Sequence, residues 1–151
     1  MQVEEQPVEL ELKFSNSLSD VWAAITDPDQ MRQWFFAEME EFEAKEGFAT
    51  EFTIEHDGRE FPHHWKVTKV QPQAHLEVEW RYKGFPGAAN LLWVLKEVPD
   101  GTLLSIKHSA LENFPKDDEV FSRESCLAGW DYLLNESLAD YLAPNQEDSA
   151  Q

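Results

Sequence analysis

His108 and Asp131 are the side chains that could act as an acid and a base on a bound molecule. His108 alternates with Leu104 and Ile106, so in a strand it shares their face, and Asp131 falls inside the apolar arc of an expected helix. A carboxyl group in apolar surroundings holds its proton more firmly and can donate it, with an imidazole as its counterpart. The alternative is that Asp131 lies at the helix edge beside a basic or amide side chain, and that His108 is a hydrogen-bonded core histidine.

The other residues that carry chemistry do not form a known site. His63 and His64 are adjacent in an expected strand and point to opposite faces, so they cannot hold one metal ion together. The spacings H-x-H, HExxH and C-x-x-C do not occur, nor does a G-x-S-x-G motif or a glycine-rich phosphate loop. Cys126, the single cysteine, has no histidine beside it in the sequence, which favours a buried structural thiol. We therefore predict no metal, no cofactor and no catalytic residue.

The elements that position these side chains begin with one strand and two short helices. Residues 8–14, VELELKF, alternate apolar and charged side chains with the period of a half-buried strand. Ser17 and Asp27 each open a helix-capping sequence, and the second is followed at once by Pro28. We expect a short helix that stops before this proline and a second short helix that ends near Trp34.

The middle of the chain, from Glu38 to Ser109, has the pattern of antiparallel hairpins. Apolar and polar side chains alternate in segments separated by the turn sequences KEGF, HDGR, VQPQA, FPGA and VPDG. The expected strands cover residues 38–44, 48–55, 61–70, 75–82, 88–98 and 102–109. Together with residues 8–14 they predict an antiparallel sheet of about seven strands.

After the NFPKDDE segment the pattern changes to a period of 3.6, which predicts a long helix that Asp117 or Asp118 caps and that runs to about Leu142. Its apolar side chains fall within about half of the circumference, with Gly129, Tyr132 and Glu136 facing away: Leu127, Trp130, Leu133, Leu134, Leu138, Tyr141 and Leu142. A sheet with one apolar face is the natural partner of such a helix, and its twist curls it around the helix. The predicted fold class is α+β, with a curved sheet that grips the C-terminal helix.

The inner face of this arrangement is the candidate binding site. Large aromatic side chains with polar tips are typical of pockets for flat or apolar molecules, because the rings supply contact area and an N–H or O–H group fixes orientation. The predicted lining consists of Phe52, Trp65, Trp80, Tyr82, Trp93, His108, Trp130, Asp131 and Leu134. The same side chains could instead fill a solid core. The FPGAAN and NFPKDDE segments and the second short helix are expected at the mouth of a pocket.

Charge and composition restrict the partners. Thirty acidic against twelve basic side chains give a net charge of −18, which repels nucleic acid and anionic membrane surfaces. A basic protein would be attracted, although such a charge also simply keeps a small domain soluble and monomeric, or at most weakly dimeric. No apolar run approaches the roughly 20 residues of a membrane span. One cysteine and a start without a signal sequence predict a cytoplasmic protein.

Three segments carry a family resemblance: VWAAITDPDQMRQWF near the start, DGTLLSIKHS at the end of the strand-rich middle, and GWDYLLNESLADYL at the close. They resemble the START-like helix-grip superfamily, SRPBCC, and within it the branch named for the activator of Hsp90 ATPase homologue. The resemblance covers residues 8 to 143. It implies a hydrophobic cavity between sheet and last helix, in a superfamily of ligand carriers, a chaperone-stimulating domain and a few enzymes. It transfers no catalytic residue to this sequence.

These observations predict a single START-like domain at residues 1–143, followed by a frayed tail at 144–151. The predicted function is binding of an apolar or aromatic small molecule in the cavity. The alternative is an interaction protein or co-chaperone-like domain that engages a protein partner. A small-molecule enzyme that uses His108 and Asp131 is the third and least favoured reading.

Overall fold

The computed structural model describes residues 2–35, 37–56, 58–115 and 117–142, so the predicted tail at 144–151 lies outside the described residues. The elements follow in this order: β1 (Val8–Phe14), α1 (Leu18–Thr26), α2 (Pro28–Trp34), β2 (Ala49–His56), β3 (Arg59–Gln71), β4 (His75–Tyr82), β5 (Ala88–Val98), β6 (Gly101–Glu112), the 3₁₀ turn η1 (Glu119–Phe121), α3 (Arg123–Tyr132), the π-helical segment η2 (Leu133–Leu138) and α4 (Ala139–Leu142).

The strands of the described residues form one six-stranded antiparallel sheet in the order β1-β6-β5-β4-β3-β2. Strands β2 to β6 pair with their neighbours in sequence, as the hairpin pattern predicts, and β1 pairs with β6 so that Val8 lies opposite His108. Irregularities interrupt the ladder between Val67 and Lys69 in β3 and at the start of β5. Such bulges bend strands and increase their twist, which helps the sheet to curve.

The predicted strand at residues 38–44 is wrong. Met39 and Phe42 are both buried there, but they are three residues apart, whereas two side chains on one face of a strand are an even number apart. The Met39 and Glu40 carbonyls each accept a hydrogen bond of 3.0 Å from Arg32 Nη1 rather than from a neighbouring strand. The sheet therefore has six strands in the described residues instead of about seven.

Both short helices begin and end as predicted. Ser17 Oγ accepts a first-turn backbone N–H of α1 at 3.1 Å, and Asp27 does the same for α2 at 3.0 Å. Pro28 occupies the start of α2, where a missing N–H costs nothing, and Trp34 ends it. The Trp34 indole N–H donates to the Ala24 carbonyl at 2.8 Å, which fixes the two helices against each other.

The C-terminal helix starts later than predicted. Neither Asp117 nor Asp118 caps it; Ser122 does, with its Oγ accepting the Ser125 backbone N–H at 3.1 Å. The Asp118 carboxylate instead binds Arg59. The segment that the sequence pattern assigned to the first helical turn is therefore a loop and the short turn η1.

The helix runs without a break from α3 to α4 but widens into π turns over Leu133–Leu138. Residues four apart overshoot a full turn in an α-helix and fall short of one in the wider π-helix. Around the helix axis, Leu134 is therefore displaced in one direction from Trp130, and Leu138 is displaced back in the opposite direction from Leu134. All three side chains stay on the sheet side, where each is buried.

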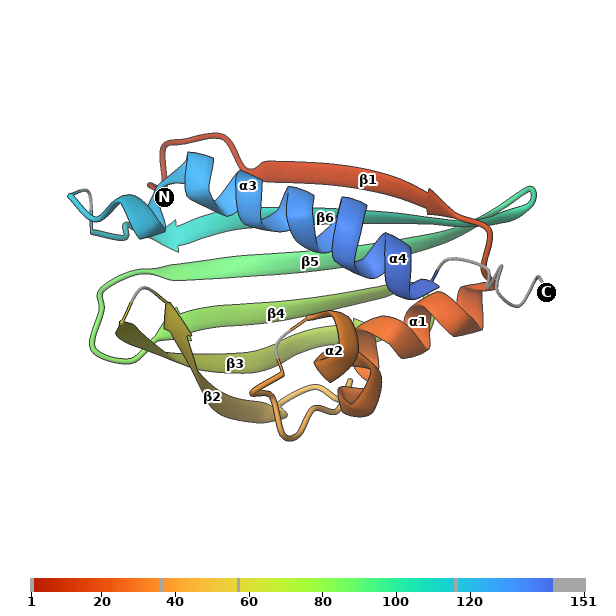
Figure 1. Cartoon of the computed structure of the whole chain (residues 1–151), viewed down its shortest axis with the longest axis horizontal. Coiled ribbons are helices and arrows are strands. Elements are labelled where there is room, and N and C mark those ends of the chain that lie inside the picture. The colour runs from red at the N-terminus through yellow and green to blue at the C-terminus, as the bar shows by residue number, and fades with distance from the viewer. Residues whose placement is uncertain (1, 36, 57, 116, 143–151) are drawn as a thin grey trace.

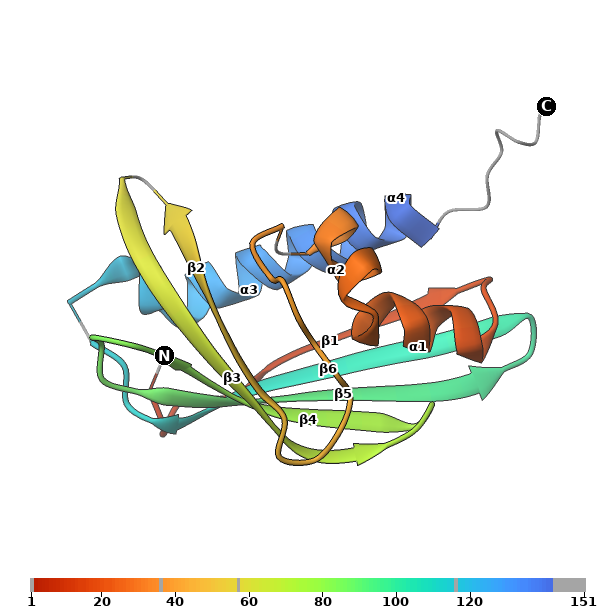
Figure 2. The ribbon, with the colours of Figure 1, turned by 90° about the horizontal axis from the view of Figure 1, so that it is seen from below.

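The helix lies across the inner face of the sheet, and α1 and α2 cover one end of the same face (Figure 1). Viewed from below, β2 and β3 rise toward the side on which the helices lie, so the sheet wraps around them (Figure 2). Trp130, Leu134, Leu138 and Leu142 are buried against this face. The predicted helix-grip architecture is confirmed.

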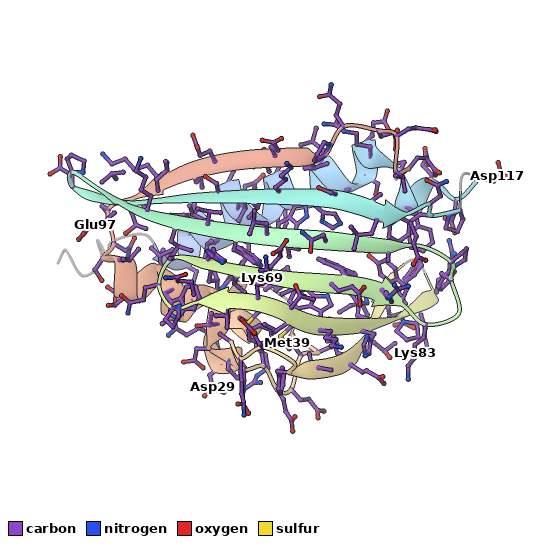
Figure 3. All side chains as sticks on the ribbon, turned by 180° about the vertical axis from the view of Figure 1, so that it is seen from behind. Asp29, Met39, Lys69, Lys83, Glu97 and Asp117 are labelled. Atoms are coloured by element: carbon purple, nitrogen blue, oxygen red, sulfur yellow. The ribbon has the colours of Figure 1, made fainter. Side chains whose placement is uncertain are left out.

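The outer face of the sheet carries charged side chains, among them Lys69 and Lys83 (Figure 3). Lys83 Nζ lies 2.8 Å from a Glu51 carboxylate oxygen, and Arg81 binds Glu112 at 3.1 Å. Exposed pairs of this kind contribute little, because both charges stay solvated and are screened by salt. The stability of the sheet therefore comes mainly from its inner face.

Candidate functional site

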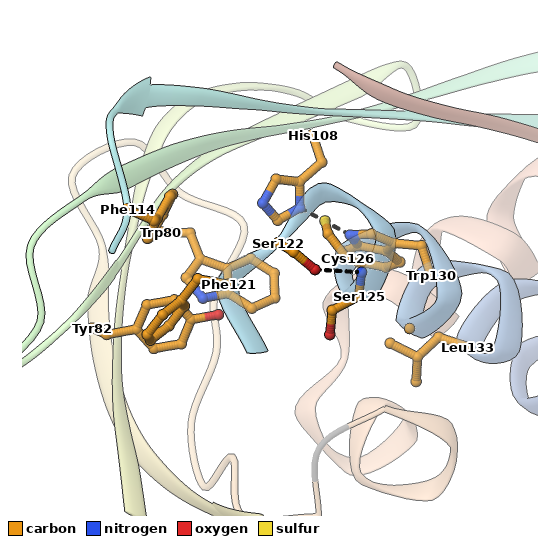
Figure 4. Close-up of a pocket in the computed structure, with 11 residues that line it drawn as sticks. Trp80, Tyr82, His108, Phe114, Phe121, Ser122, Ser125, Cys126, Trp130 and Leu133 are labelled. Atoms are coloured by element: carbon orange, nitrogen blue, oxygen red, sulfur yellow. Dashed lines mark hydrogen bonds between the residues drawn. The ribbon is translucent and has the colours of Figure 1, made fainter. Parts of the chain in front are cut away.

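A pocket lies where the inner face of the sheet meets the first turns of the C-terminal helix (Figure 4). Its volume is about 170 Å³. An engineered protein cavity of roughly 150 Å³ holds one benzene molecule, so this space suits a single ring. The lining residues come from β4, β6, the loop after β6 and the helix: Trp80, Tyr82, His108, Phe114, Phe121, Ser122, Ser125, Cys126, Gly129, Trp130 and Leu133.

The predicted site residues divide into three groups. Trp80, Tyr82, His108 and Trp130 line the pocket. Four others are buried in the core and do not line it: Phe52, Trp65, Trp93 and Leu134. The remaining one, Asp131, is exposed on the helix. Alternation along the strands thus identified the inner face correctly, but it did not distinguish pocket from core.

Asp131 lies outside the pocket, which corrects the expectation that it faces the interior. Its carboxylate accepts a hydrogen bond of 2.7 Å from Asn135 Nδ2, so it has an amide partner at the helix surface. The helical wheel assumed a regular α-helix to Leu142, whereas the π turns rotate the last apolar residues relative to Asp131. His108 and Asp131 therefore do not form an acid–base pair.

Phe35, the residue directly after α2, is partly buried and packs among aromatic side chains beneath the C-terminal helix. Its ring centroid lies 5.0 Å from that of Trp34, 5.5 Å from Trp65 and 5.8 Å from Trp130. Trp93 packs edge-on against the same ring at 6.4 Å. This aromatic cluster occupies the space beneath the middle of the helix, so the pocket is confined to the end near the β6–α3 connection.

His108 and Trp130 are joined by a hydrogen bond across the pocket wall. The indole Nε1–H of Trp130 donates to His108 Nδ1 at 2.9 Å (Figure 4). Burial lowers the pKa of His108 from its ordinary 6.5 to about 4, so the ring is neutral at pH 7. A neutral imidazole has one donor and one acceptor nitrogen. Because Nδ1 accepts, the proton must reside on Nε2.

Two further titratable groups face the pocket, and both are neutral at pH 7. Burial raises the pKa of the Cys126 thiol to about 12, which keeps the thiol protonated and a poor nucleophile. Burial also raises the pKa of the Tyr82 phenol. Cys126 is only partly buried and lines the pocket, so a buried structural thiol stays a prediction. The pocket holds no charged side chain among its lining residues.

The rim of the pocket is a cluster of aromatic rings with one ion pair. Phe114 and Phe121 stack with their centroids 5.7 Å apart, and Phe121 also packs on Phe85 at 5.2 Å. The Arg59 guanidinium lies 4.8 Å from the Phe61 ring. Its two terminal nitrogens bind the Asp118 carboxylate at 2.7 and 3.2 Å. These contacts therefore tie together the start of β3, the β4–β5 connection and the loop before the helix.

Metal and membrane features are both absent from the part of the chain that the structure describes. No group of three or more His, Cys, Asp or Glu side chains there is arranged to hold a metal ion. Among the same residues, no helix combines the length and the apolar character that crossing a bilayer requires.

Comparison with known families decides the relationship. Residues 16–143 match the model of the family described as Activator of Hsp90 ATPase homolog 1-like protein. The chain belongs to this family. No curated protein sequence matches the chain.

Solved structures share the fold of this family member. A protein from Chromobacterium violaceum has a TM-score of 0.78 and 21% identity, over 92% of this chain and 98% of that chain. CalU16 from Micromonospora echinospora has a TM-score of 0.65 and 22% identity, over 93% and 78%. DynU16, described as a protein in the dynemicin biosynthetic locus, has a TM-score of 0.68 and 21% identity, over 96% and 48%. This chain thus spans about half of DynU16. Identities this low show a common fold alone.

Several pocket residues of this family member were not predicted. Gly129 was expected to face away from the sheet, yet it lies on the pocket rim. Phe114 lies in the NFPKDDE segment that was predicted at the mouth, and Phe121 follows that segment by two residues, so this aromatic pair was the available signal. Ser122 and Ser125 were missed because the helix start was placed too early.

Proposed function

We propose that this protein binds a small apolar or aromatic molecule in the pocket between β4, β6 and α3, and we assign it no reaction. The observation that carries this proposal is a space of about 170 Å³ lined mainly by aromatic rings, with a few polar groups. Ligand sites typically combine apolar walls with a small number of placed polar groups. Here those groups are His108, Tyr82 and the two serines at the helix start.

The fold relatives are compatible with this proposal. A grip between a curved sheet and a helix leaves room at its ends, because a curved surface and a straight rod do not match along their whole length. One fold relative, DynU16, is described as a protein in the dynemicin biosynthetic locus. We take this as support for a small-molecule ligand here.

The test is a titration of intrinsic fluorescence, because two of the six tryptophans, Trp80 and Trp130, line the pocket. A panel of single-ring and larger apolar compounds should produce a saturable change with the single-ring members. Gly129→Leu should abolish this change, because a Cβ built on Gly129 meets nothing within 4 Å and the added side chain would occupy the pocket.

Ala128→Leu is the matched control. Ala128 lies on the same helical turn but borders a depression on the outer side of the helix. Gly129→Leu raises helix propensity and Ala128→Leu lowers it only slightly, so both variants should fold. Loss of the fluorescence change in Gly129→Leu alone supports binding in the pocket. A panel without any response in the unaltered protein, or an equal response in both variants, contradicts the proposal.

A protein partner remains the alternative, and the net charge of −18 favours it. The described large apolar side chains that are exposed are spread along the chain: Val3 before β1, Val94 in β5, Leu111 in β6, and Tyr132 and Tyr141 on the C-terminal helix. A partner would therefore be held mainly by charge, and its capture should be strongest at low ionic strength. Failure to capture a partner there counts against this alternative. Cytoplasmic location and a monomeric or weakly dimeric state stay predictions.

A further inference from the structure

His108 presents the pocket with a single hydrogen-bond donor whose position is fixed. Nδ1 accepts the hydrogen bond from Trp130. The proton of the His108 ring therefore cannot move from Nε2 to Nδ1 without breaking this buried hydrogen bond of 2.9 Å. His108 is only 7% exposed, so that bond is shielded from water. Breaking it would leave the indole N–H without a partner, which is costly in the interior.

The donor on Nε2 is available to a ligand. This nitrogen points away from Trp130, toward the side on which Phe114 and Trp80 lie (Figure 4). It has no hydrogen bond to any residue that the structure describes. Its closest ring neighbour is Trp80, with centroids 5.2 Å apart, and an indole ring is at best a weak acceptor.

No side chain that lines the pocket around this donor is charged. The titratable groups that face the pocket from β4, β6 and α3 are Tyr82, His108 and Cys126, and all are neutral at pH 7. Arg123 is close in sequence, but its guanidinium donates to the Gln6 and Pro7 carbonyls at 2.8 and 3.0 Å. An anionic ligand would therefore enter the pocket without a lining cation to pair with, which burial makes expensive.

We infer that the pocket selects a neutral, single-ring ligand bearing a carbonyl-type acceptor, which receives a hydrogen bond from His108 Nε2–H. This inference rests on the proposed function and adds the chemical class of the ligand to it. The serine hydroxyls at the helix start can hold further polar groups of such a ligand. Ser122 Oγ accepts the Ser125 backbone N–H, so the Ser122 hydroxyl proton is left to donate to the ligand.

The first experiment reads the tautomer directly. Two-dimensional ¹⁵N–¹H spectra of the histidine rings near pH 7 should show His108 with its proton on Nε2. His63 is the internal control, because its Nδ1 lies 2.7 Å from the Phe61 carbonyl oxygen and must donate to it. The two buried histidines should therefore show opposite tautomers. A proton on Nδ1 of His108 overturns the inference whether or not the pocket binds ligands.

The second experiment compares three probes that share one skeleton of heavy atoms: acetophenone, α-methylstyrene and benzoate. The first has a neutral acceptor, the second has a methylene group in its place, and the third is an anion. Acetophenone should bind roughly tenfold more tightly than α-methylstyrene, as expected for one hydrogen bond in an apolar site. Benzoate should bind more weakly than acetophenone. Calorimetry or tryptophan fluorescence gives the dissociation constants.

Variants at the histidine complete the test. His108→Leu should bring the acetophenone and α-methylstyrene affinities together, while His108→Gln should keep part of the preference, because an amide can accept from Trp130 and donate to the ligand. Equal affinities in the unaltered protein overturn the inference but leave ligand binding intact. Tighter binding of benzoate overturns the neutral class. No binding of any probe overturns both this inference and the proposed function for single-ring compounds.

Discussion

At the scale of single residues, His63 and His108 couple the stability of the fold to pH. Burial lowers the pKa of each from 6.5 to about 4, whereas both titrate normally in the unfolded chain. Between these pKa values the unfolded chain binds protons that the folded chain does not, so the free energy of unfolding falls as pH falls. We expect a loss of about 2 kcal/mol per histidine from pH 7 to pH 5, measured by urea unfolding.

Carboxylates also begin to titrate near pH 5, so the histidine share must be separated by substitution. His108→Gln removes one of the two buried histidines. The fall in unfolding free energy from pH 7 to pH 5 should therefore be smaller in this variant by the contribution of one histidine. A difference that is unchanged in this variant would show that His108 is not the group responsible.

The indole N–H groups of Trp130 and Trp93 allow the buried hydrogen bond to be measured. Trp130 donates to His108, whereas Nε1 of the fully buried Trp93 has no hydrogen-bond partner in the described structure. Trp130→Phe and Trp93→Phe both remove a ring of the same size from the core. Trp130→Phe should nevertheless cost about 1–2 kcal/mol more in unfolding free energy, because only this substitution leaves a buried acceptor, His108 Nδ1, without a hydrogen bond. Equal costs would contradict a role for this bond.

At this scale the sequence predicted types and faces but not contacts. Alternation placed Trp80, Tyr82 and His108 on the inner face, since the period of a strand is local. The hydrogen bond between His108 and Trp130 joins a strand to a helix, and the two residues are 22 positions apart in the sequence. No local pattern specifies such a pair. The charge state and tautomer of His108 follow from this contact and from burial, so they became visible only in the folded chain.

At the scale of elements, the β4–β5 connection controls the rim through Gly87. This residue has φ of 112°, and a Cβ built on it would lie 2.5 Å from Cδ1 of Phe114. Gly87→Ala should therefore displace Phe114 and loosen the loop before the helix. Gly84→Ala is the control, because Gly84 also has positive φ, 86°, but a Cβ there meets nothing within 4 Å.

The control variant measures backbone strain alone, roughly 1 kcal/mol. Gly87→Ala should lose about 1–3 kcal/mol more in urea unfolding, since an overpacked ring must move. It should also weaken the binding of any pocket ligand. Equal stability of the two variants would mean that Phe114 moves aside without cost.

Elements with strong local signals were predicted well, and those that depend on tertiary contacts were not. Ser17, Asp27 and Pro28 fixed both short helices because capping and proline geometry act within one turn. Residues 38–44 were mistaken for a strand because the core buries Met39 and Phe42 without a ladder. The π turns of the last helix also follow from packing on the sheet, which a regular helical wheel does not represent.

At the scale of the whole molecule, the net charge of −18 opposes compaction. Screening should therefore stabilise the fold, and the melting temperature should rise by a few degrees when NaCl increases from about 10 mM to about 200 mM. The double substitution Glu41→Lys and Glu43→Lys at exposed positions should reduce this rise, because it removes part of the repulsion. A melting temperature that falls with salt would indicate that attractive ion pairs dominate instead.

The overall architecture was predictable because a long helix that is apolar over half of its circumference must bury that side, and the apolar face of the sheet can cover it. The volume of the pocket was not, since it depends on how completely Phe35 fills the centre of the grip. That residue follows α2 directly, and its reach into the core depends on where α2 sits. The sequence left a solid core and a pocket as alternatives. The residues proposed for the lining divide between the two, since some are packed in the core and others border the small pocket.

The pairing of β1 with β6 has a consequence for the order of assembly. Strands β2 to β6 can zip together as consecutive hairpins while the chain is being made, but β1 finds its only described strand neighbour when β6 has been synthesised. The helix that covers the inner face comes later still. Until translation is nearly finished, a nascent chain therefore exposes the aromatic inner face of the sheet and an unpaired first strand. Exposed apolar surface and unpaired strand edges make such a chain prone to aggregation.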